Sequence, residues 1–401
     1  MKKLFLLAWP IALAAVSCSN EEVVSVNNDA NEITFTAVAN NATRAADAYC
    51  NAFMPGDFDV WARVGDAEYF ANVHYTKDGE TTTYKAAGGE VHFWPTTGTD
   101  VSFWAAKNHN NSGEGTFTWP GNTGTPTIEF EPAATAAAQH DLLYAYTVKS
   151  RPEYAAKGAV EMNFRHALSQ IVFKAKVSNP TIKVQIDQVK VCRIKGKGTF
   201  TYPNAVTDNN YPNHANGTQA ETGTGTWVMS TTEATDVDYT TDAFDLVTIT
   251  NGNTENLTEE TTTDDKTGRD FEHSLLLLPQ ETAAWSHTAG TTGTGVDAAG
   301  ATGAYFLVYC KIWNVSANGN ELLLWDNAGA TKAVAIPVAI NWLPGRKYIY
   351  TFNFGSKTTG GFDPETGEDV LIPISFNVTV DDFVNVTDIP VWMGPDETPA
   401  P

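Results

Sequence analysis

The sequence lacks the motifs of the common enzyme classes. It has no GxSxG elbow, no HExxH zinc motif, no P-loop and no complete GxGxxG. Gly196-Lys197-Gly198 supplies only two of the three glycines of a dinucleotide-binding turn, and an ordinary turn after a strand explains it. The eight histidines are scattered along the chain. We therefore predict that the chain is not an enzyme and has no cofactor.

A few residues still have side chains suited to chemistry. His140, Asp141 and His166 could exchange protons, but a surface or hydrogen-bonded structural role is the favoured interpretation. Residues 363–369 carry oxygen ligands that a calcium ion could use, but without the spacing of an EF-hand, so a solvated acidic turn is favoured. A carboxylate pair for glycoside hydrolysis is not singled out either. We predict no metal site.

Positive charge is scarce. The chain has 25 Lys and Arg against 47 Asp and Glu, a formal net charge of −22 at pH 7. A chain this acidic repels nucleic acid and anionic membrane surfaces, so neither is an expected partner. Hydrophobic residues make up 42% of the sequence, which is enough for a packed core and excludes a chain of low complexity throughout.

Cysteine is also scarce, with four residues and no CxxC spacing that would indicate zinc or redox chemistry. Cys18 follows the N-terminal apolar segment, and the other three cysteines are Cys50, Cys192 and Cys310. Three thiols allow one disulfide with one free thiol, or no disulfide. Cys192 and Cys310 each lie in a run typical of a strand, where cysteine usually serves as a small buried hydrophobe.

Long apolar runs are missing except at the N-terminus. Two lysines precede residues 4–16, which are almost wholly apolar and too short for a spanning helix of roughly 20 residues. This is the pattern of a secretory signal. Ala15-Val16-Ser17 before Cys18 resembles a bacterial lipobox, with Ala15 in place of the more usual Leu. We predict a lipoprotein signal peptide over residues 1–17, and acylation of Cys18 that binds the chain to outer-membrane lipid.

Regular helical periodicity is missing as well, and short alternating segments replace it. Apolar and polar residues alternate between turns rich in Thr, Asn and Gly, which is typical of half-buried strands. Only residues 133–139 resemble a helix. Many short strands with little helix predict an all-β fold of β-sandwiches. The predicted strands are residues 33–37, 57–64, 91–94, 100–105, 141–147, 160–164, 171–177, 182–191, 226–229, 243–249, 273–278, 304–313, 322–325, 333–340, 348–354 and 372–380.

Two local features qualify these strands. The apolar residues of 182–191 change parity at Asp187-Gln188, which predicts a bulge or a change of sheet there. Pro373 cannot donate a ladder hydrogen bond, so it marks an edge strand or the first residues of a strand.

The tryptophans could serve either in the hydrophobic core or on a sugar-binding surface. Stacked tryptophan rings could form a platform for sugars, but most of these residues lie within strand patterns, so we expect them in the core. The residues concerned are Trp61, Trp94, Trp104, Trp119, Trp227 and Trp313.

The length of 401 residues indicates two or three domains. We place a boundary at Asn179-Pro180. The predicted organisation is a tether over residues 18–31, an N-terminal β-sandwich domain over 32–178 and a C-terminal one over 179–401. Residues 201–269 and 288–302 read as long loops.

Several segments, in order along nearly the whole chain, resemble the fimbrillin family of Bacteroidetes. Residues 201–269 are not covered by this resemblance. The segments that carry it are the lipobox at Cys18, Ile33-Thr34-Phe35-Thr36-Ala37 followed by Thr43-Arg44-Ala45, Val91-His92-Phe93-Trp94-Pro95, residues 140–145, residues 164–173, and Trp342-Leu343-Pro344-Gly345-Arg346 with the tyrosines that follow.

The resemblance implies a fold of two tandem transthyretin-like β-sandwich domains and a mechanism of strand exchange. A lipoprotein precursor reaches the outer membrane, an Arg-specific protease cuts after the first strand, and a strand from a neighbouring subunit replaces the one that leaves. In this sequence the cleavage falls between Arg44 and Ala45, in a stretch of small polar residues that reads as an exposed loop.

The residues themselves are consistent with such an exchange. Ile33, Phe35 and Ala37 form one apolar face, so their removal would uncover a hydrophobic groove and unpaired backbone groups. A candidate donor strand near the C-terminus has the matching alternation, and residues 383–392 could extend it. Its apolar residues are Ile372, Ile374, Phe376, Val378 and Val380.

Two functions follow from this sequence. The first is a surface-exposed fimbrial subunit or adhesin whose partners are neighbouring pilin subunits. The alternative is a monomeric lipoprotein of the cell surface that binds glycans. The host or bacterial ligand of either is not readable from the sequence.

Overall fold

The computed structural model describes most of the chain between Glu32 and Asp382. In the described residues, regular structure is strand, and helix is limited to the 3₁₀ turns η2 (Ala87–Gly89) and η4 (Ala136–Ala138), so the all-β prediction is confirmed. None of the described helices is long and apolar enough to cross a membrane. The described ranges are 32–39, 57–79, 81–95, 100–110, 114–150, 158–204, 206–208, 220–222, 224–231, 236–241, 243–258, 274–286, 295–298, 300–356, 360–370 and 372–382.

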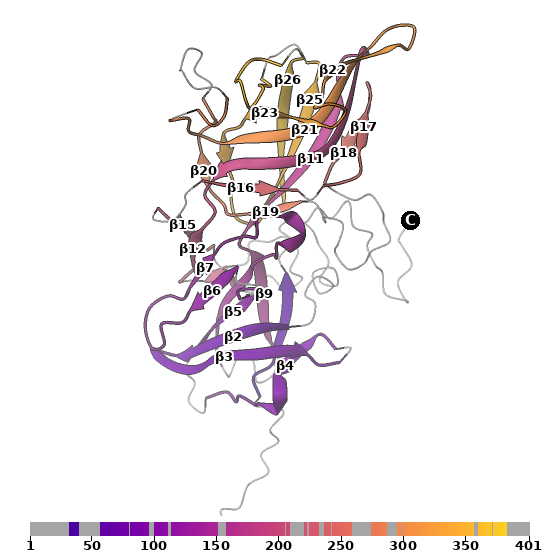
Figure 1. Ribbon diagram of the computed structural model, residues 1–401. Coiled ribbons are helices and arrows are strands. Elements are labelled where there is room, and N and C mark those ends of the chain that lie inside the picture. The colour runs from indigo at the N-terminus through magenta and orange to yellow at the C-terminus, as the bar shows by residue number, and fades with distance from the viewer. Residues whose placement is uncertain are drawn as a thin grey trace, which may run out of the picture.

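The N-terminal strands form a closed barrel in the order β1-β4-β3-β2-β5-β8-β9 (Figure 1). Alternation explains its interior: Phe58, Val60 and Ala62 of β2 point inward and are buried, while Asp57 and Asp59 point outward. The strands are β1 (Phe35–Ala39), β2 (Asp57–Val64), β3 (Ala67–Lys77), β4 (Thr83–Ala86), β5 (Val101–Lys107), β8 (Leu143–Lys149) and β9 (Val160–His166).

Two barrel segments differ from the sequence prediction. The predicted strand over residues 91–94 is wrong: Phe93 makes only a single bridge, to Glu32, and Pro95 has no N–H with which to extend a ladder. Strand β3 was not predicted. Its register with β2 shifts twice between Val60 and Arg63, so its buried residues Phe70 and Val73 fall on opposite parities and hide the period of two.

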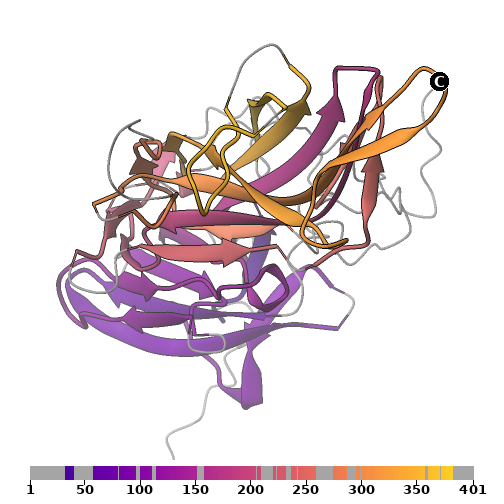
Figure 2. The ribbon, with the colours of Figure 1, turned by 45° about the horizontal axis from the view of Figure 1, so that its top comes forward.

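The C-terminal strands form a sandwich of two sheets around a shared hydrophobic core (Figure 2). One sheet has the order β18-β10-β25-β26, with β19 also on β10. The other has the order β16-β11-β21-β22, with β17 also on β11 and β23 on β21. The strands are β10 (Ser169–Val177), β11 (Ile182–Ile194), β16 (Val237–Thr240), β17 (Val247–Ile249), β18 (Thr254–Asn256), β19 (Leu275–Leu277), β21 (Tyr305–Val315), β22 (Glu321–Trp325), β23 (Lys332–Pro337), β25 (Arg346–Phe354) and β26 (Ile374–Asp382).

The predicted parity change within residues 182–191 is confirmed. The ladder between β11 and β21 pairs Ile186 with Cys310 and then Gln188 with Tyr309, so Asp187 is the extra residue of a bulge. The bulge allows Ile186 and Val189 to face the same core although their spacing is odd.

Residues on either side of the predicted boundary at 178/179 are linked by strands. Strand β10 precedes it but pairs in parallel with β25 along Gln170 to Val177. A further sheet, β15-β12-β7-β6, joins β6 (Gly115–Thr118) and β7 (Thr127–Phe130) to β12 (Gly198–Thr201) and β15 (Thr226–Met229). Phe200 of this linking sheet and Tyr202 just after it form one hydrophobic cluster with Trp61, Trp104 and Tyr144 on the outside of the barrel.

The smaller elements complete the described chain. Strands β13 (Val206–Asp208) and β14 (Ala220–Thr222) form one pair, and β20 (Glu281–Thr282) and β24 (Ile340–Asn341) another. Cys192 and Cys310 are free and buried, and burial raises the pKa of each thiol well above its ordinary value. They therefore serve as small hydrophobes, as predicted, and Cys50 lies outside the described residues.

Candidate assembly site

Strand β1 closes the barrel. It runs parallel to β9, pairing Phe35 with Val160 and Ala39 with Phe164, and antiparallel to β4, pairing Phe35 with Tyr84. Without β1, β4 and β9 would each have one unpaired edge facing the same gap. A single strand from elsewhere could restore both ladders.

The inward face of β1 is fully buried. Ile33, Phe35 and Ala37 are at most 2% exposed. The Phe35 ring centroid lies 4.7 Å from that of Tyr75 and 5.3 Å from that of Phe103, both in edge-to-face geometry. Burial raises the pKa of Tyr75 far above its ordinary value.

The start of β1 is held by a second segment. The Ile33 N–H donates to the carbonyl of His92 at 2.7 Å, and the Val160 N–H donates to the carbonyl of Thr34 at 2.7 Å. The hydroxyl of Tyr69 donates to the carbonyl of Phe93 on the same segment. Residues 92–93 thus hold the chain just before β1 by a backbone hydrogen bond and do not form the strand that was predicted there.

The predicted processing residues cannot be placed. Cys18, Arg44 and Ala45 lie outside the described residues, as does the predicted tether. Arg44 follows Ala39, the last residue of β1, by five positions in the sequence.

The predicted donor strand is β26, which pairs with β25 from Ile374 to Asp382 and has no other strand neighbour among the described residues. Its apolar face is buried only at the beginning. Ile374 is 0% exposed and Phe376 packs against Phe306, whereas Val378 and Val380 are 47% and 54% exposed. Ile372 lies in the core just before the strand. The second half of β26 is therefore an edge with an uncovered apolar face.

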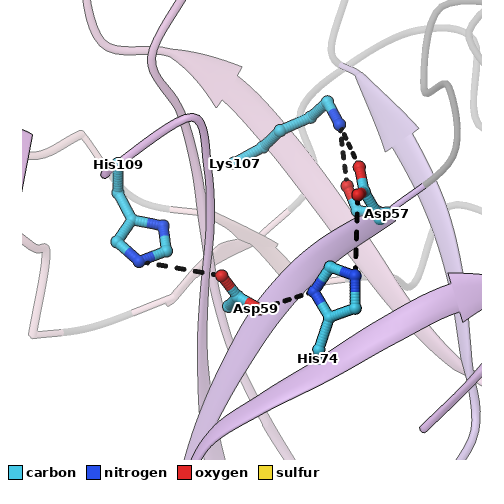
Figure 3. A network of polar contacts seen from close by, with 5 residues as sticks. All are labelled: Asp57, Asp59, His74, Lys107 and His109. Atoms are coloured by element: carbon cyan, nitrogen blue, oxygen red, sulfur yellow. Dashed lines mark hydrogen bonds and ion pairs between the residues drawn. The ribbon is translucent and has the colours of Figure 1, made fainter. Parts of the chain in front are cut away.

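A network of charged side chains fixes the outer face of the barrel near the start of β2 (Figure 3). His74 Nδ1 lies 2.8 Å from Asp59 Oδ1, and His109 Nε2 lies 3.7 Å from the other oxygen of that carboxylate. Lys107 Nζ donates to the Asp57 carboxylate at 2.6 Å. Burial lowers the pKa of His109, an effect that the charge of Asp59 partly opposes. The network joins β2, β3, β5 and the chain just after β5, and each of its two carboxylates is paired with a Lys or His.

The other candidate residues have structural surroundings. His166 Nδ1 lies 2.5 Å from Asp141 Oδ2, and His140 Nδ1 lies 2.7 Å from Glu114 Oε2. In the acidic turn, burial tends to raise the pKa of Asp363, but hydrogen bonds from Lys332 and from backbone N–H groups lower it overall. Within the described ranges no group of acidic, His or Cys side chains has the geometry of a metal site.

The tryptophans divide into two groups. Trp61, Trp94 and Trp104 are buried, as predicted, whereas Trp119, Trp227 and Trp313 are only partly covered. Trp119 and Trp227 nevertheless pack against a buried aromatic cluster, so among these six tryptophans the expectation of core packing fails only for Trp313, which belongs to no hydrophobic cluster of the described residues.

The chain is similar to one protein family and to several solved structures. The profile of the Fimbrillin-like family matches residues 23–368. A fimbrial protein from Bacteroides vulgatus is similar in structure with a TM-score of 0.54 and 15% identity, over 88% of this chain and 100% of that one. A candidate cell adhesion protein from Bacteroides eggerthii has a TM-score of 0.41 and 14% identity, over 88% and 96%. No curated protein matches the sequence.

Proposed function

Because the chain belongs to the fimbrillin-like family, we propose that it is a surface subunit of a fimbrium that assembles with other subunits by strand exchange. Membership of this family confirms the prediction that the chain is not an enzyme. The observation that carries the proposal is the position of β1, a single amphipathic strand that closes the barrel between β4 and β9.

Release of β1 creates the acceptor. Its departure uncovers the rings of Phe58, Tyr75 and Phe103 and the backbone edges of β4 and β9. Exposing each large apolar side chain costs about 1.5–3 kcal/mol, so the open groove strongly favours any strand that can fill it. The parallel pairing with β9 defines the direction in which a replacement strand copies β1.

Cleavage between Arg44 and Ala45 is the step that frees β1. Acylation at Cys18 delivers the precursor to the outer membrane, and the cut then separates the lipid and β1 from the rest of the subunit. The anchor is therefore a delivery device in subunits that polymerise. The tandem transthyretin-like domains, with a boundary near residue 178, belong to the same proposal.

The donor lies at the end of β26. Val378 and Val380 lie on the core-facing side of β26 but are exposed, while Ile372, Ile374 and the ring of Phe376 on that side contribute to the subunit's own core. Donation from the exposed half, extended by the apolar residues of 383–392, preserves that core. Donation of the whole strand would also break the ladder with β25.

Polymerisation after cleavage tests the function. Purified precursor is incubated with an Arg-specific protease and separated on gels without boiling, and the new N-terminus is identified by mass spectrometry. We expect an N-terminus at Ala45 together with a ladder of oligomers. Cleavage at Ala45 that leaves only monomer would refute strand exchange.

Three variants separate the parts of the mechanism. Arg44→Ala should prevent both the cut and the ladder. Val378→Asp with Val380→Asp should permit the cut but abolish the ladder, because a charged face cannot enter an apolar groove. Thr379→Asp is the matched control, since Thr379 is exposed and has the opposite parity on the same strand. Equal ladders from the double variant and its control would remove β26 from the donor role.

A further inference from the structure

The outer face of the sheet that contains β11 and β21 gathers lysines and aromatic rings. These strands lie side by side (Figure 1), and their register pairs Lys183 with Trp313, Gln185 with Lys311, and Gln188 with Tyr309. All of these side chains point away from the core, because their neighbours Val184, Ile312 and Val308 are buried in it. The face is thus a two-strand strip of rings, amides and ammonium groups, with one carboxylate at the bulge, Asp187, which accepts a hydrogen bond from the Thr331 hydroxyl at 3.0 Å.

The lysines on this strip are largely uncompensated. Lys183 Nζ lies 4.7 Å from the Trp313 ring centroid, and Lys190 Nζ lies 5.3 Å from that of Tyr309. Lys183 pairs with Glu321 at 2.6 Å. In the part of the chain that the structure describes, Lys190 and Lys311 make no ion pair. Two free positive charges on one strip stand out on a chain with a net charge of −22.

The strip has a closed end and an open end. Towards the start of β21, Tyr305 and Leu307 are covered by Trp285, Val296 and Phe362. Tyr309, Lys311 and Trp313 are partly exposed and belong to no hydrophobic cluster of the described residues, and Leu323 of β22, which pairs with Trp313, is 39% exposed. The open part extends about 13 Å along the strand at about 3.4 Å per residue.

We propose that this strip binds a carboxylated oligosaccharide. Aromatic rings suit the C–H faces of sugars, and Lys190 and Lys311 can form charge-assisted hydrogen bonds with carboxylates. The amide nitrogens of Gln185 and Gln188 donate to Thr248 and Thr241, which leaves their amide oxygens to accept from sugar hydroxyl groups. Densely charged polyanions such as nucleic acid are repelled by the rest of the chain, so a sugar chain with sparse carboxylates fits better. The assignment does not depend on strand exchange.

Titration calorimetry with the full chain tests the proposal. The probe is a hyaluronan hexasaccharide, which carries a carboxylate on every second ring, and its partner is the same hexasaccharide with the carboxylates reduced to alcohols. We expect the charged sugar to bind, and the reduced sugar to bind at least tenfold more weakly. Absence of binding by the charged sugar, or equal binding of both, overturns the proposal.

Variants locate the binding. Lys190→Gln with Lys311→Gln should weaken binding of the hexasaccharide at least tenfold. Lys77→Gln with Lys85→Gln removes the same charge from barrel strands β3 and β4 and should leave it unchanged. Equal effects of the two double variants overturn the assignment. Sedimentation velocity tests whether the strip instead joins two copies of the chain. If the chain self-associates and only Lys190→Gln with Lys311→Gln abolishes this, the strip is a contact between copies and the sugar proposal is wrong.

Discussion

Replacing Phe35 with alanine should loosen β1 without disturbing the sandwich. The ring is fully buried and packs against Tyr75, Phe103 and Phe58, with centroids at 4.7, 5.3 and 6.2 Å. A buried Phe→Ala change costs about 3–5 kcal/mol. If this loss acts on local release of β1, the population of the open barrel rises by about 10² to 10³ or more, at 1.4 kcal/mol per tenfold.

Hydrogen exchange followed by mass spectrometry measures this effect. We expect faster exchange in peptides that cover β1 and β9, and unchanged exchange in β11 and β21. Thr36→Ala is the matched control, since Thr36 lies on the opposite face of β1 and is only half-buried. Its effect should stay below about 1 kcal/mol. After cleavage, Phe35→Ala should also accelerate the appearance of oligomers.

Two results would refute this reasoning. Equal exchange in the Phe35 and Thr36 variants would mean that the apolar face does not hold β1 in place. Loss of protection in all barrel strands together would mean that β1 cannot leave separately, and strand exchange would then require unfolding of the whole barrel.

Three further predictions concern the regions around the barrel. Burial lowers the pKa of His109, so below about pH 6.5 the unfolded chain binds more protons than the folded chain. The free energy of unfolding should therefore fall on acidification, by at most about 1.4 kcal/mol per pH unit. His109→Gln should remove this part of the pH dependence, as measured by urea titrations at a series of pH values. Arg63 is buried between Trp104 and Trp119, with its Cζ 5.1 and 4.5 Å from their ring centroids, and its Nη1 donates to the Gly124 carbonyl at 2.7 Å. Arg63→Lys should therefore destabilise the protein by about 1–3 kcal/mol in chemical denaturation, whereas Lys85→Arg should have almost no effect. A Cβ at Gly225 would lie 2.1 Å from the Phe200 ring, so Gly225→Ala should lower the melting temperature by several degrees, at about 2–4 °C per kcal/mol. At Gly252 a Cβ would have no atom within 4 Å, so the control Gly252→Ala should show only the smaller strain of a positive φ.

Alternation along the chain was sufficient to predict much of the strand content. Residues 57–64 and 226–229 form strands with the predicted limits, and the bulge at Asp187 follows from a parity change that can be read directly from apolar positions. The method failed where ladders are irregular. Strand β3 was missed because its register shifts hide the period of two. Residues 91–94 alternate, but they form a single bridge and have no partner strand.

The sequence by itself determined that β1 has one apolar face, that β26 has another, and that the chain is acidic and rich in strands. Only the tertiary structure decided that β1 lies between β4 and β9, that β26 is covered along half its length, and that Lys311 comes to lie beside Gln185 on the sheet face that also carries Lys190. The reason is physical. Alternation specifies which face of a strand meets the core, whereas the neighbour of a strand is chosen by packing between residues far apart in the sequence, such as Phe35 and Val160. Both the proposed acceptor groove and the lysine strip arise from such neighbours.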